Sequence, residues 1–196
     1  NASTGSMGIA IAREAAARGA RVTLILGPTA LPAPADAQTI RVTTAQEMYE
    51  VALAHSEDAE LTIATAAVSD YRPATVSNEK MKKADAAVAL QMVRNPDILK
   101  TLGEKKHAGY LVGFAAETHA HEDNALQKLR SKNLDAIAVN DVGAGRGFGL
   151  QENTLTLLFA DGTREDLGTS SKPELAGRML DAISLKMGAT RDAAGN

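Results

Sequence analysis

Short apolar runs alternate with longer amphipathic runs along the first two thirds of the chain. The short runs, rich in β-branched and leucine side chains, predict strands at residues 21–26, 61–65, 86–93, 110–114 and 135–139. The longer runs predict helices at residues 7–19, 45–55, 119–132 and 172–187, with another helix beginning near Pro96. Strands that alternate with helices favour a parallel sheet covered by helices on both faces.

Turn chemistry at the end of the chain adds a second kind of strand pairing. Asp161-Gly162 lies between apolar runs at residues 154–159 and 164–167 and predicts a β-hairpin. The expected fold is therefore α/β and Rossmann-like, with a mainly parallel sheet, helices on both faces and a C-terminal β-hairpin at one edge.

Capping and loop signals divide the rest of the chain. Thr44 and Glu47 have the spacing of a capping box at the start of the second helix. Three prolines predict an extended loop at residues 28–36, and residues 66–77 form a further expected loop. Four glycines within residues 143–149 predict a mobile loop after the fifth strand.

The two ends of the sequence carry separate expectations. Residues 1–188 are expected to form one domain, and residues 189–196 a disordered tail. The chain opens with Asn1-Ala-Ser-Thr-Gly-Ser-Met-Gly8, a glycine-containing loop that leads into the first helix. Such loops normally follow a strand, so we expect a first strand that this sequence lacks.

Composition narrows the function classes. The 196 residues are 44% hydrophobic, which suffices for a core, while a net charge of −3 and 3% aromatic residues disfavour nucleic-acid binding. The absence of cysteine removes disulfides, thiolate metal ligands and cysteine nucleophiles. The apolar runs are shorter than the roughly 20 residues that span a bilayer, and no leader peptide stands at the start. We expect a cytoplasmic enzyme or binding module without membrane or nucleic-acid partners.

The opening loop is the first candidate site. Ser3, Thr4 and Gly5 would present N–H groups and hydroxyls at a helix N-terminus, where an anion is favoured, although an ordinary helix start explains the pattern equally well. A nicotinamide-dependent reductase is the alternative. The strand at 21–26 ends in Gly27-Pro28 without an acidic residue for a ribose, and no tyrosine has a lysine four residues later.

Small and charged residues follow the second strand. The small side chains at positions 64–66 let a flat ligand approach the backbone, and Asp70 could accept from sugar hydroxyls or hold a metal, unless it only pairs with Arg72. Lys80 and the two lysines just after it suit the charge of phosphates, although such a run is more often a solvated face.

Four further residues extend the candidate site. Phe114 either stacks on a base or fills the core, and Lys128 and Lys132 lie four apart on one helix face. Asn140 ends a buried strand, where its carboxamide either orients a substrate amide or caps a turn. The four histidines lack metal-binding spacing with carboxylates, so no metal site is assigned to protein side chains.

Six segments together carry a resemblance to a known family. They are Asn1-Ala-Ser-Thr-Gly-Ser-Met-Gly8, Ala66-Ala-Val-Ser-Asp-Tyr-Arg72, Glu79-Lys-Met-Lys-Lys83, Arg94-Asn-Pro-Asp-Ile98, Val112-Gly-Phe-Ala-Ala-Glu117 and Ala138-Val-Asn-Asp-Val142. In this order, over nearly the whole chain, they resemble the phosphopantothenate–cysteine ligase family, the synthetase of bacterial coenzyme A biosynthesis.

The resemblance implies a two-step, CTP-dependent reaction. The carboxylate of 4′-phosphopantothenate attacks the α-phosphate of CTP, which gives an acyl cytidylate and pyrophosphate, and the amine of L-cysteine then displaces CMP. The resemblance also implies Mg²⁺, a homodimer, and a fused or separate decarboxylase. Because the decarboxylase domain is not in this sequence, no flavin is expected.

The resemblance also implies roles for individual residues. Lys80 and Asn1 would be catalytic. The implied contacts with CTP are Ala64, Thr65, Ala66, Asp70, Lys80, Pro96, Asp97, Ile98, Leu99, Phe114, Lys128 and Lys132, and those with the other substrates are Asn1, Ser3, Thr4, Gly5 and Asn140. Ala2 and Ser6 stand where the family usually has a basic residue and a lysine. The alternatives are a nucleotide-binding module or inactive fragment of such an enzyme and, less favoured, an NAD(P)-binding reductase.

Overall fold

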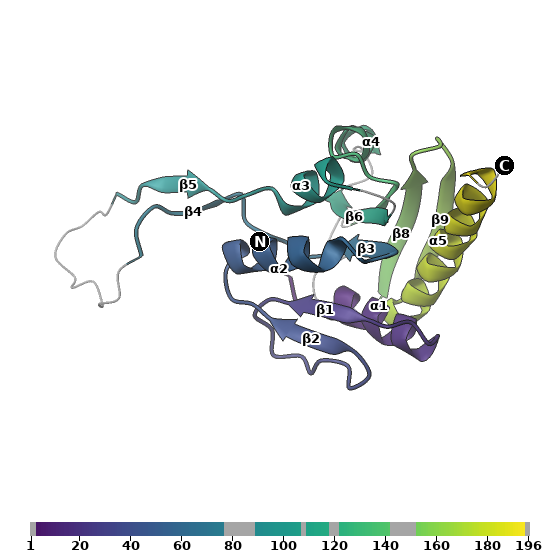
Figure 1. Ribbon diagram of the computed structural model, residues 1–196, viewed down its shortest axis with the longest axis horizontal. Helices are drawn as coiled ribbons and strands as arrows, with labels where there is room; N and C mark the ends of the chain where they lie inside the picture. Colours follow the sequence, from purple (N-terminus) through teal and green to yellow (C-terminus); the bar gives the residue numbers. More distant parts are fainter. Residues whose placement is uncertain (1–2, 77–88, 107–108, 118–121, 142–151, 195–196) are drawn as a thin grey trace.

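Five helices and three separate sheets make up the part of the chain that the structure describes. The computed structural model describes residues 3–76, 89–106, 109–117, 122–141 and 152–194 (Figure 1). The largest sheet has the strand order β3-β6-β7-β8-β9 and forms the centre of the molecule. It is built from β3 (Leu61–Ala64), β6 (Tyr110–Glu117), β7 (Ala136–Asp141), β8 (Glu152–Phe159) and β9 (Arg164–Ser171).

Strand direction changes across this sheet as the sequence predicts. β3, β6 and β7 run parallel, whereas β7, β8 and β9 pair in antiparallel fashion. The β8–β9 turn contains Gly162 at a φ of 85°, and the N–H of Thr163 donates to Oδ1 of Asp161 over 2.9 Å. A positive φ is accessible to glycine at little cost, which explains the Asp-Gly signal. The α/β class with a C-terminal hairpin at one edge is confirmed.

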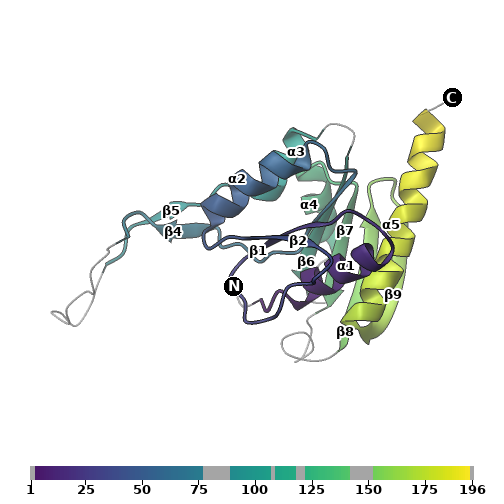
Figure 2. The same ribbon diagram turned by 60° about the horizontal axis from the view of Figure 1, so that its bottom comes forward.

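Helices cover both faces of the five-stranded sheet. The helices α1 (Ser6–Ala17) and α5 (Lys172–Ala194) lie side by side on one face, which we call the α1/α5 face (Figure 2). The other, called the α3/α4 face, carries α2 (Ala45–Ser56), α3 (Ile98–Glu104) and α4 (Glu122–Ser131). Successive apolar side chains of β6, β7 and β8 point to opposite faces of the sheet. Because both sets are apolar, these strands contribute to a core on each side of the sheet.

Two small sheets stand apart from the central one. β1 (Thr23–Leu26) pairs in parallel only with β2 (Gln38–Arg41), so the expectation that this strand joins one continuous sheet is wrong for the described residues. The reason is that no described strand lies between β1 and β3 to bond both. The strand expected before Asn1 stays a prediction.

The third sheet is a narrow antiparallel pair that extends away from the body of the molecule (Figure 1). It consists of β4 (Tyr71–Pro73) and β5 (Met92–Arg94). The expected loop at 66–77 therefore contains a strand. Of the strand expected at 86–93, residues 92 and 93 belong to β5, residues 89–91 do not form a strand, and residues 86–88 lie outside the described residues. Tyr71, Val76, Leu90 and Met92 are exposed apolar residues of this β4–β5 arm.

Several boundaries differ from the sequence-based expectations. α5 continues past Gly188 to Ala194, so residues 189–194 are helical and the expected disordered tail is wrong there. Pro96 precedes the N-cap residue Asp97 instead of opening the helix, and β2 was not predicted. The capping box of Thr44 and Glu47 is confirmed by reciprocal hydrogen bonds. The loop at 143–149 lies outside the described residues.

Candidate functional site

The start of α1 meets the carboxyl end of β3. A Cβ atom built on Gly8 would lie 2.7 Å from Oγ1 of Thr65, so only glycine leaves room for this hydroxyl. On the other side, a Cβ on Gly5 would lie 3.7 Å from Leu26 at the end of β1. The turn before α1 thus lies between the carboxyl ends of β1 and β3, the edge at which open α/β sheets bind ligands.

The geometry of this turn leaves the start of α1 without a side-chain cap. Gly5 occupies the N-cap position at a φ of 75°, and no side chain of its own can accept from the first-turn N–H groups. Oγ1 of Thr29 donates to the carbonyl of Thr4 over 2.8 Å and fixes the turn, while the hydroxyls of Thr4 and Ser6 lie 2.8 Å apart. An uncapped helix start of this kind suits an anion. Asn1, the proposed catalytic partner of this turn, lies outside the described residues.

The base of the β4–β5 arm is fixed by Asn95. Its N–H donates to the carbonyl of Asp70 and its Nδ2 to the carbonyl of Ser69, each over 2.8 Å. Arg72 donates to Oδ1 of Asn95 over 3.1 Å and to the carbonyl of Arg94 over 2.8 Å. Arg72 therefore bonds these groups, and the carboxylate of Asp70 remains exposed at the arm's base. Lys80 lies outside the described residues.

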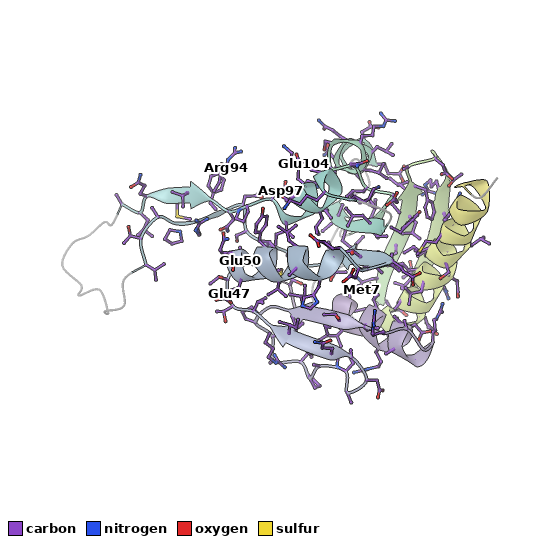
Figure 3. The ribbon with its side chains drawn as sticks, viewed as in Figure 1. Met7, Glu47, Glu50, Arg94, Asp97 and Glu104 are labelled. Carbon is purple, nitrogen blue, oxygen red and sulfur yellow. The ribbon has the colours of Figure 1, made fainter. Side chains whose placement is uncertain are left out.

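Asp97 connects two of the predicted site elements. Figure 3 labels Asp97 beside α3. Its carboxylate accepts from Nζ of Lys132 at 2.9–3.0 Å and caps α3 by accepting from the N–H of Lys100 over 3.0 Å. Partial burial raises the pKa of Asp97, but the hydrogen bonds from Lys132 and Lys100 outweigh it, so the pKa lies below its usual value. The ammonium of Lys132 is thereby held next to the first turn of α3.

Close backbone packing sets the position of Lys132. A Cβ atom on Gly103 would lie 1.8 Å from the carbonyl oxygen of Lys132, and Nδ2 of Asn133 donates to the carbonyl of Gly103 over 2.9 Å. α3 and the end of α4 therefore touch through their backbones. Lys128, one turn earlier on α4, is exposed.

Phe114 and Asn140 lie on the opposite side of the sheet, the α1/α5 face. Phe114 is half-buried against the apolar cluster of that face, which Met7 of α1 also contacts. Oδ1 of Asn140, near the end of β7, accepts from Nδ2 of Asn153 on β8 over 3.1 Å. The predicted residues thus divide into a neutral group on this face and a charged group on the α3/α4 face.

Asn153 is the residue that the sequence reasoning missed. It is 8% exposed, and it shares one strand face with three apolar residues of β8 that are almost fully buried, Leu155, Leu157 and Phe159. A carboxamide in register with such residues interrupts the alternation of a core strand. This break in the apolar pattern is the feature of the sequence that could have identified Asn153 as a candidate site residue.

Other features of the described residues contribute no group to the site at the carboxyl ends of β1 and β3. A cavity of about 260 Å³ lies at the opposite, amino-terminal edge of β3 and β6, lined by residues such as Leu53, Thr62 and Lys105, and it contains none of the predicted site residues. In the described ranges, no three histidine, aspartate or glutamate side chains are placed to hold a metal ion. The described helices include none that is long and apolar enough to cross a bilayer.

Comparisons with known proteins place the chain in a family. The model of the DNA/pantothenate metabolism flavoprotein C-terminal domain matches residues 1–186. The chain is 46% identical over 186 residues to the coenzyme A biosynthesis bifunctional protein CoaBC of Bacillus subtilis, covering 94% of this chain and 46% of that protein. It is 43% identical over 185 residues to the protein of the same name from Escherichia coli, covering 92% and 45%.

Solved structures agree with this placement. The crystal structure of the C-terminal domain of a coenzyme A biosynthesis bifunctional protein CoaBC superposes with a TM-score of 0.82 at 39% identity, over 96% of this chain and 86% of that one. A DNA/pantothenate metabolism flavoprotein from Streptococcus pneumoniae, 21% identical with a TM-score of 0.79 over 95% of this chain and 90% of that one, shares the fold.

Fold and site together define an α/β domain in which the turn before α1 lies between the carboxyl ends of β1 and β3, and Asn140 lies near the carboxyl end of β7. The chain belongs to the family of DNA/pantothenate metabolism flavoprotein C-terminal domains. The family resemblance drawn from the six sequence segments is confirmed. The chain spans less than half the length of the curated relatives to which it is similar.

Proposed function

We propose that this chain catalyses the CTP-dependent joining of 4′-phosphopantothenate to L-cysteine in coenzyme A biosynthesis, through an acyl cytidylate and with release of CMP and pyrophosphate. Family membership over residues 1–186 is the observation that carries the proposal. The names of the relatives, which are bifunctional proteins of coenzyme A biosynthesis, support it.

The charged group of the site suits the nucleotide. In the first step, negative charge spreads over the phosphate oxygens of CTP, and preorganised cations lower its energy. Lys132, held next to α3 by Asp97, and Lys80 would supply such cations, with Lys128 on the same helix face as Lys132. The small residues at 64–66 and the carboxylate of Asp70 would face the nucleoside.

The start of α1 and Asn140 suit the other substrate, whereas Phe114 of the neutral group would contact CTP. The uncapped start of α1, at Ser3, Thr4 and Gly5, would take an anionic part of 4′-phosphopantothenate, and Asn140 would bind its uncharged portion. Asn1 would act on the acyl cytidylate. In the second step, the cysteine amine attacks the acyl carbon, CMP leaves with the bonding electrons, and the amide forms after loss of a proton.

Mg²⁺ enters this proposal with the nucleotide. The described side chains form no cluster of three acidic or histidine ligands, so they do not fit a magnesium site built by the protein alone. The triphosphate of CTP offers the hard oxygen ligands that Mg²⁺ prefers.

The proposal includes a homodimer. The β4–β5 arm extends from the body and exposes apolar side chains, of which Val76 is 79% and Leu90 61% exposed (Figure 1). Apolar residues on a narrow two-stranded arm gain stability when a second copy covers them. A decarboxylase, fused or separate, would supply the reaction that follows.

The test is a product assay with matched lysine variants. The chain is mixed with CTP, Mg²⁺, 4′-phosphopantothenate and L-cysteine, and release of CMP and pyrophosphate is followed together with amide formation. Lys80→Gln should abolish turnover and keep the melting temperature within a few degrees, whereas Lys105→Gln, at the opposite edge of the sheet, should remain active. Normal turnover by Lys80→Gln would contradict the catalytic role of Lys80.

The absence of basic residues at Ala2 and Ser6 favours one competing function, a nucleotide-binding module without catalysis. Stabilisation by CTP without product would support that alternative. Quenching of NADPH fluorescence on addition of the chain would instead support a reductase.

A further inference from the structure

Asn153 is a buried polar residue in an otherwise apolar row. It lies on β8 at 8% exposure, and the next three residues on its side of the strand, Leu155, Leu157 and Phe159, are at most 3% exposed. A leucine at this position would extend the row and bury more apolar surface. The carboxamide therefore weakens the packing of this part of the core.

The hydrogen bonds of Asn153 are incomplete. Its Nδ2 donates to Oδ1 of Asn140, but its own Oδ1 is buried and has no hydrogen-bond partner among the described residues. A buried acceptor without a donor typically costs about 1–3 kcal/mol. Backbone hydrogen bonds already join β7 to β8, through pairs such as Asn140 with Leu155, so the strands do not need this side-chain bond to stay together. Departures from local packing rules of this kind occur preferentially at functional or strained positions.

The bond from Asn153 determines which end of the Asn140 carboxamide is free. Oδ1 of Asn140 is occupied as an acceptor, so Nδ2 is the end that remains to bond a ligand, and no hydrogen bond to it occurs among the described residues. Asn140 is half-buried near the carboxyl end of β7, on the same face of the sheet as Phe114 and the start of α1. The free end is a hydrogen-bond donor at the edge where ligands of such sheets bind.

We propose that Asn153 is a positioning residue of the ligase site. It fixes the carboxamide of Asn140 so that Nδ2 of Asn140 donates to an acceptor oxygen of the pantothenoyl portion of 4′-phosphopantothenate, its amide carbonyl or its carboxylate. This inference rests on the proposed function, because it names the substrate group that the same site recognises. Asn153 itself does not touch the substrate.

The experiment is a double-mutant cycle on the Michaelis constant for 4′-phosphopantothenate, at saturating CTP and L-cysteine. Asn153→Ala should raise this constant about tenfold, the effect of losing one oriented hydrogen bond, while the Michaelis constant for CTP stays within twofold. In the Asn140→Ala background, Asn153→Ala should have no further effect, because its only route to the substrate is then gone.

Two further variants separate positioning from packing. Ser170→Ala alters another buried polar residue, the cross-strand neighbour of Asn153 on β9, and should lower the melting temperature without changing either Michaelis constant. Asn153→Asp keeps the shape of the side chain but only accepts, so it would turn Nδ2 of Asn140 away from the substrate. Where this variant folds, its Michaelis constant for 4′-phosphopantothenate should rise as much as that of Asn153→Ala.

Each outcome decides between the inference and the function on which it rests. An active chain in which Asn153→Ala behaves like Ser170→Ala, or loses as much with Asn140→Ala present as without it, overturns the inference and leaves the ligase intact. If calorimetry shows that the chain binds 4′-phosphopantothenate but the chain does not turn over, the proposed ligase function is overturned. The double-mutant cycle of Asn140 and Asn153, measured on the dissociation constant for 4′-phosphopantothenate, then still decides the role of Asn153. A chain that neither binds nor turns over this substrate overturns both.

Discussion

The two faces of the central sheet differ in the depth of their apolar cores and in the placement of their ion pairs. On the α1/α5 face, apolar side chains such as Leu157, Leu175, Met179 and Ile183 are fully buried, and polar contacts occur at its margins. On the α3/α4 face, apolar packing is joined by the Asp97–Lys132 ion pair and by a bond from Lys106 to Asp135 over 2.9 Å. Both faces gain stability from burial, which is non-directional, and both add ion pairs, since Arg18 at the end of α1 also bonds Asp181 of α5 over 2.7 Å. The faces differ in how deeply their apolar side chains are buried and in where the ion pairs lie.

This difference corresponds to the two groups of site residues. The α1/α5 face carries the neutral residues Phe114 and Asn140, while the α3/α4 face carries Lys128 and Lys132. A charged side chain needs a partner to keep a single conformation, because its long aliphatic part is flexible. A half-buried carboxamide needs only a neighbour that fixes which way it is turned. The predictions below test how separate these two faces are.

The largest expected effect is a cavity on the α1/α5 face. Ile183→Ala removes a side chain that is completely buried and should lower the free energy of unfolding by about 3 kcal/mol. Leu126→Ala, on the half-buried side of α4, should lower it by no more than about 1 kcal/mol. Urea unfolding of both variants measures the difference, and equal losses would contradict the proposed dominance of burial on the α1/α5 face.

The next effect concerns the backbone contact on the α3/α4 face. Gly103→Ala places a methyl group within 1.8 Å of a carbonyl oxygen, so α3 must move away from Lys132, at a cost of about 2 kcal/mol. Gly188→Ala is the matched control, because this glycine also lies in a helix and its Cβ would meet no atom within 4 Å. That change should raise stability by up to about 1 kcal/mol. Thermal melts distinguish the signs, and the same sign in both variants would refute the close contact.

Alkaline pH should weaken the molecule through Tyr110, which packs against the α1/α5 cluster. Burial, together with the charges of Asp135 and Asp161, raises the pKa of Tyr110 to about 12, above the value of 10 in the unfolded chain. Between pH 10 and 12 the unfolded state therefore loses its proton first, and stability falls by about 1 kcal/mol at pH 11. Tyr110→Phe should remove this part of the pH dependence. Parallel slopes for the two proteins between pH 9 and 11 would show that another group titrates.

The sequence predicted the parts of the fold that local chemistry determines. The Thr44 capping box, the Asp161-Gly162 hairpin and the apolar runs of β6 and β7 each depend on residues close together in the chain. β2 and β4 were missed because short, half-exposed strands have little apolar periodicity and form only when a partner strand pairs with them. The extent of α5 beyond Gly188 was missed because the last residues of the chain are small and polar, which is typical of a disordered terminus.

The candidate site could be predicted only as a set of separate residues. Order along the chain indicated Asp97, Lys132 and Asn140, but the ion pair between the first two joins positions 35 apart and depends on how α3 packs on α4. The link from Asn153 to Asn140 likewise depends on the pairing of β7 with β8. Register between strands is a tertiary property that spacing in the sequence does not encode by itself.

The smallest expected effect isolates the charge of Asp97 from its capping role. Asn is as good an N-cap as Asp, so Asp97→Asn keeps the cap on α3 but weakens the bond to Lys132, at a cost of about 0.5 kcal/mol near pH 7. Because the pKa of Asp97 is lowered in the folded state, its contribution is complete above the unfolded value of 3.8 and is lost as the pH falls through the lower folded value. The stability difference between wild type and Asp97→Asn should therefore shrink below pH 4. Glu104→Gln, which removes the looser surface pair with Lys100 at 3.7 Å, is the control and should change stability less at every pH. If the stability deficit of Asp97→Asn were the same at pH 3 and pH 7, the carboxylate charge would contribute nothing to holding Lys132, and the cap alone would explain the position of Asp97.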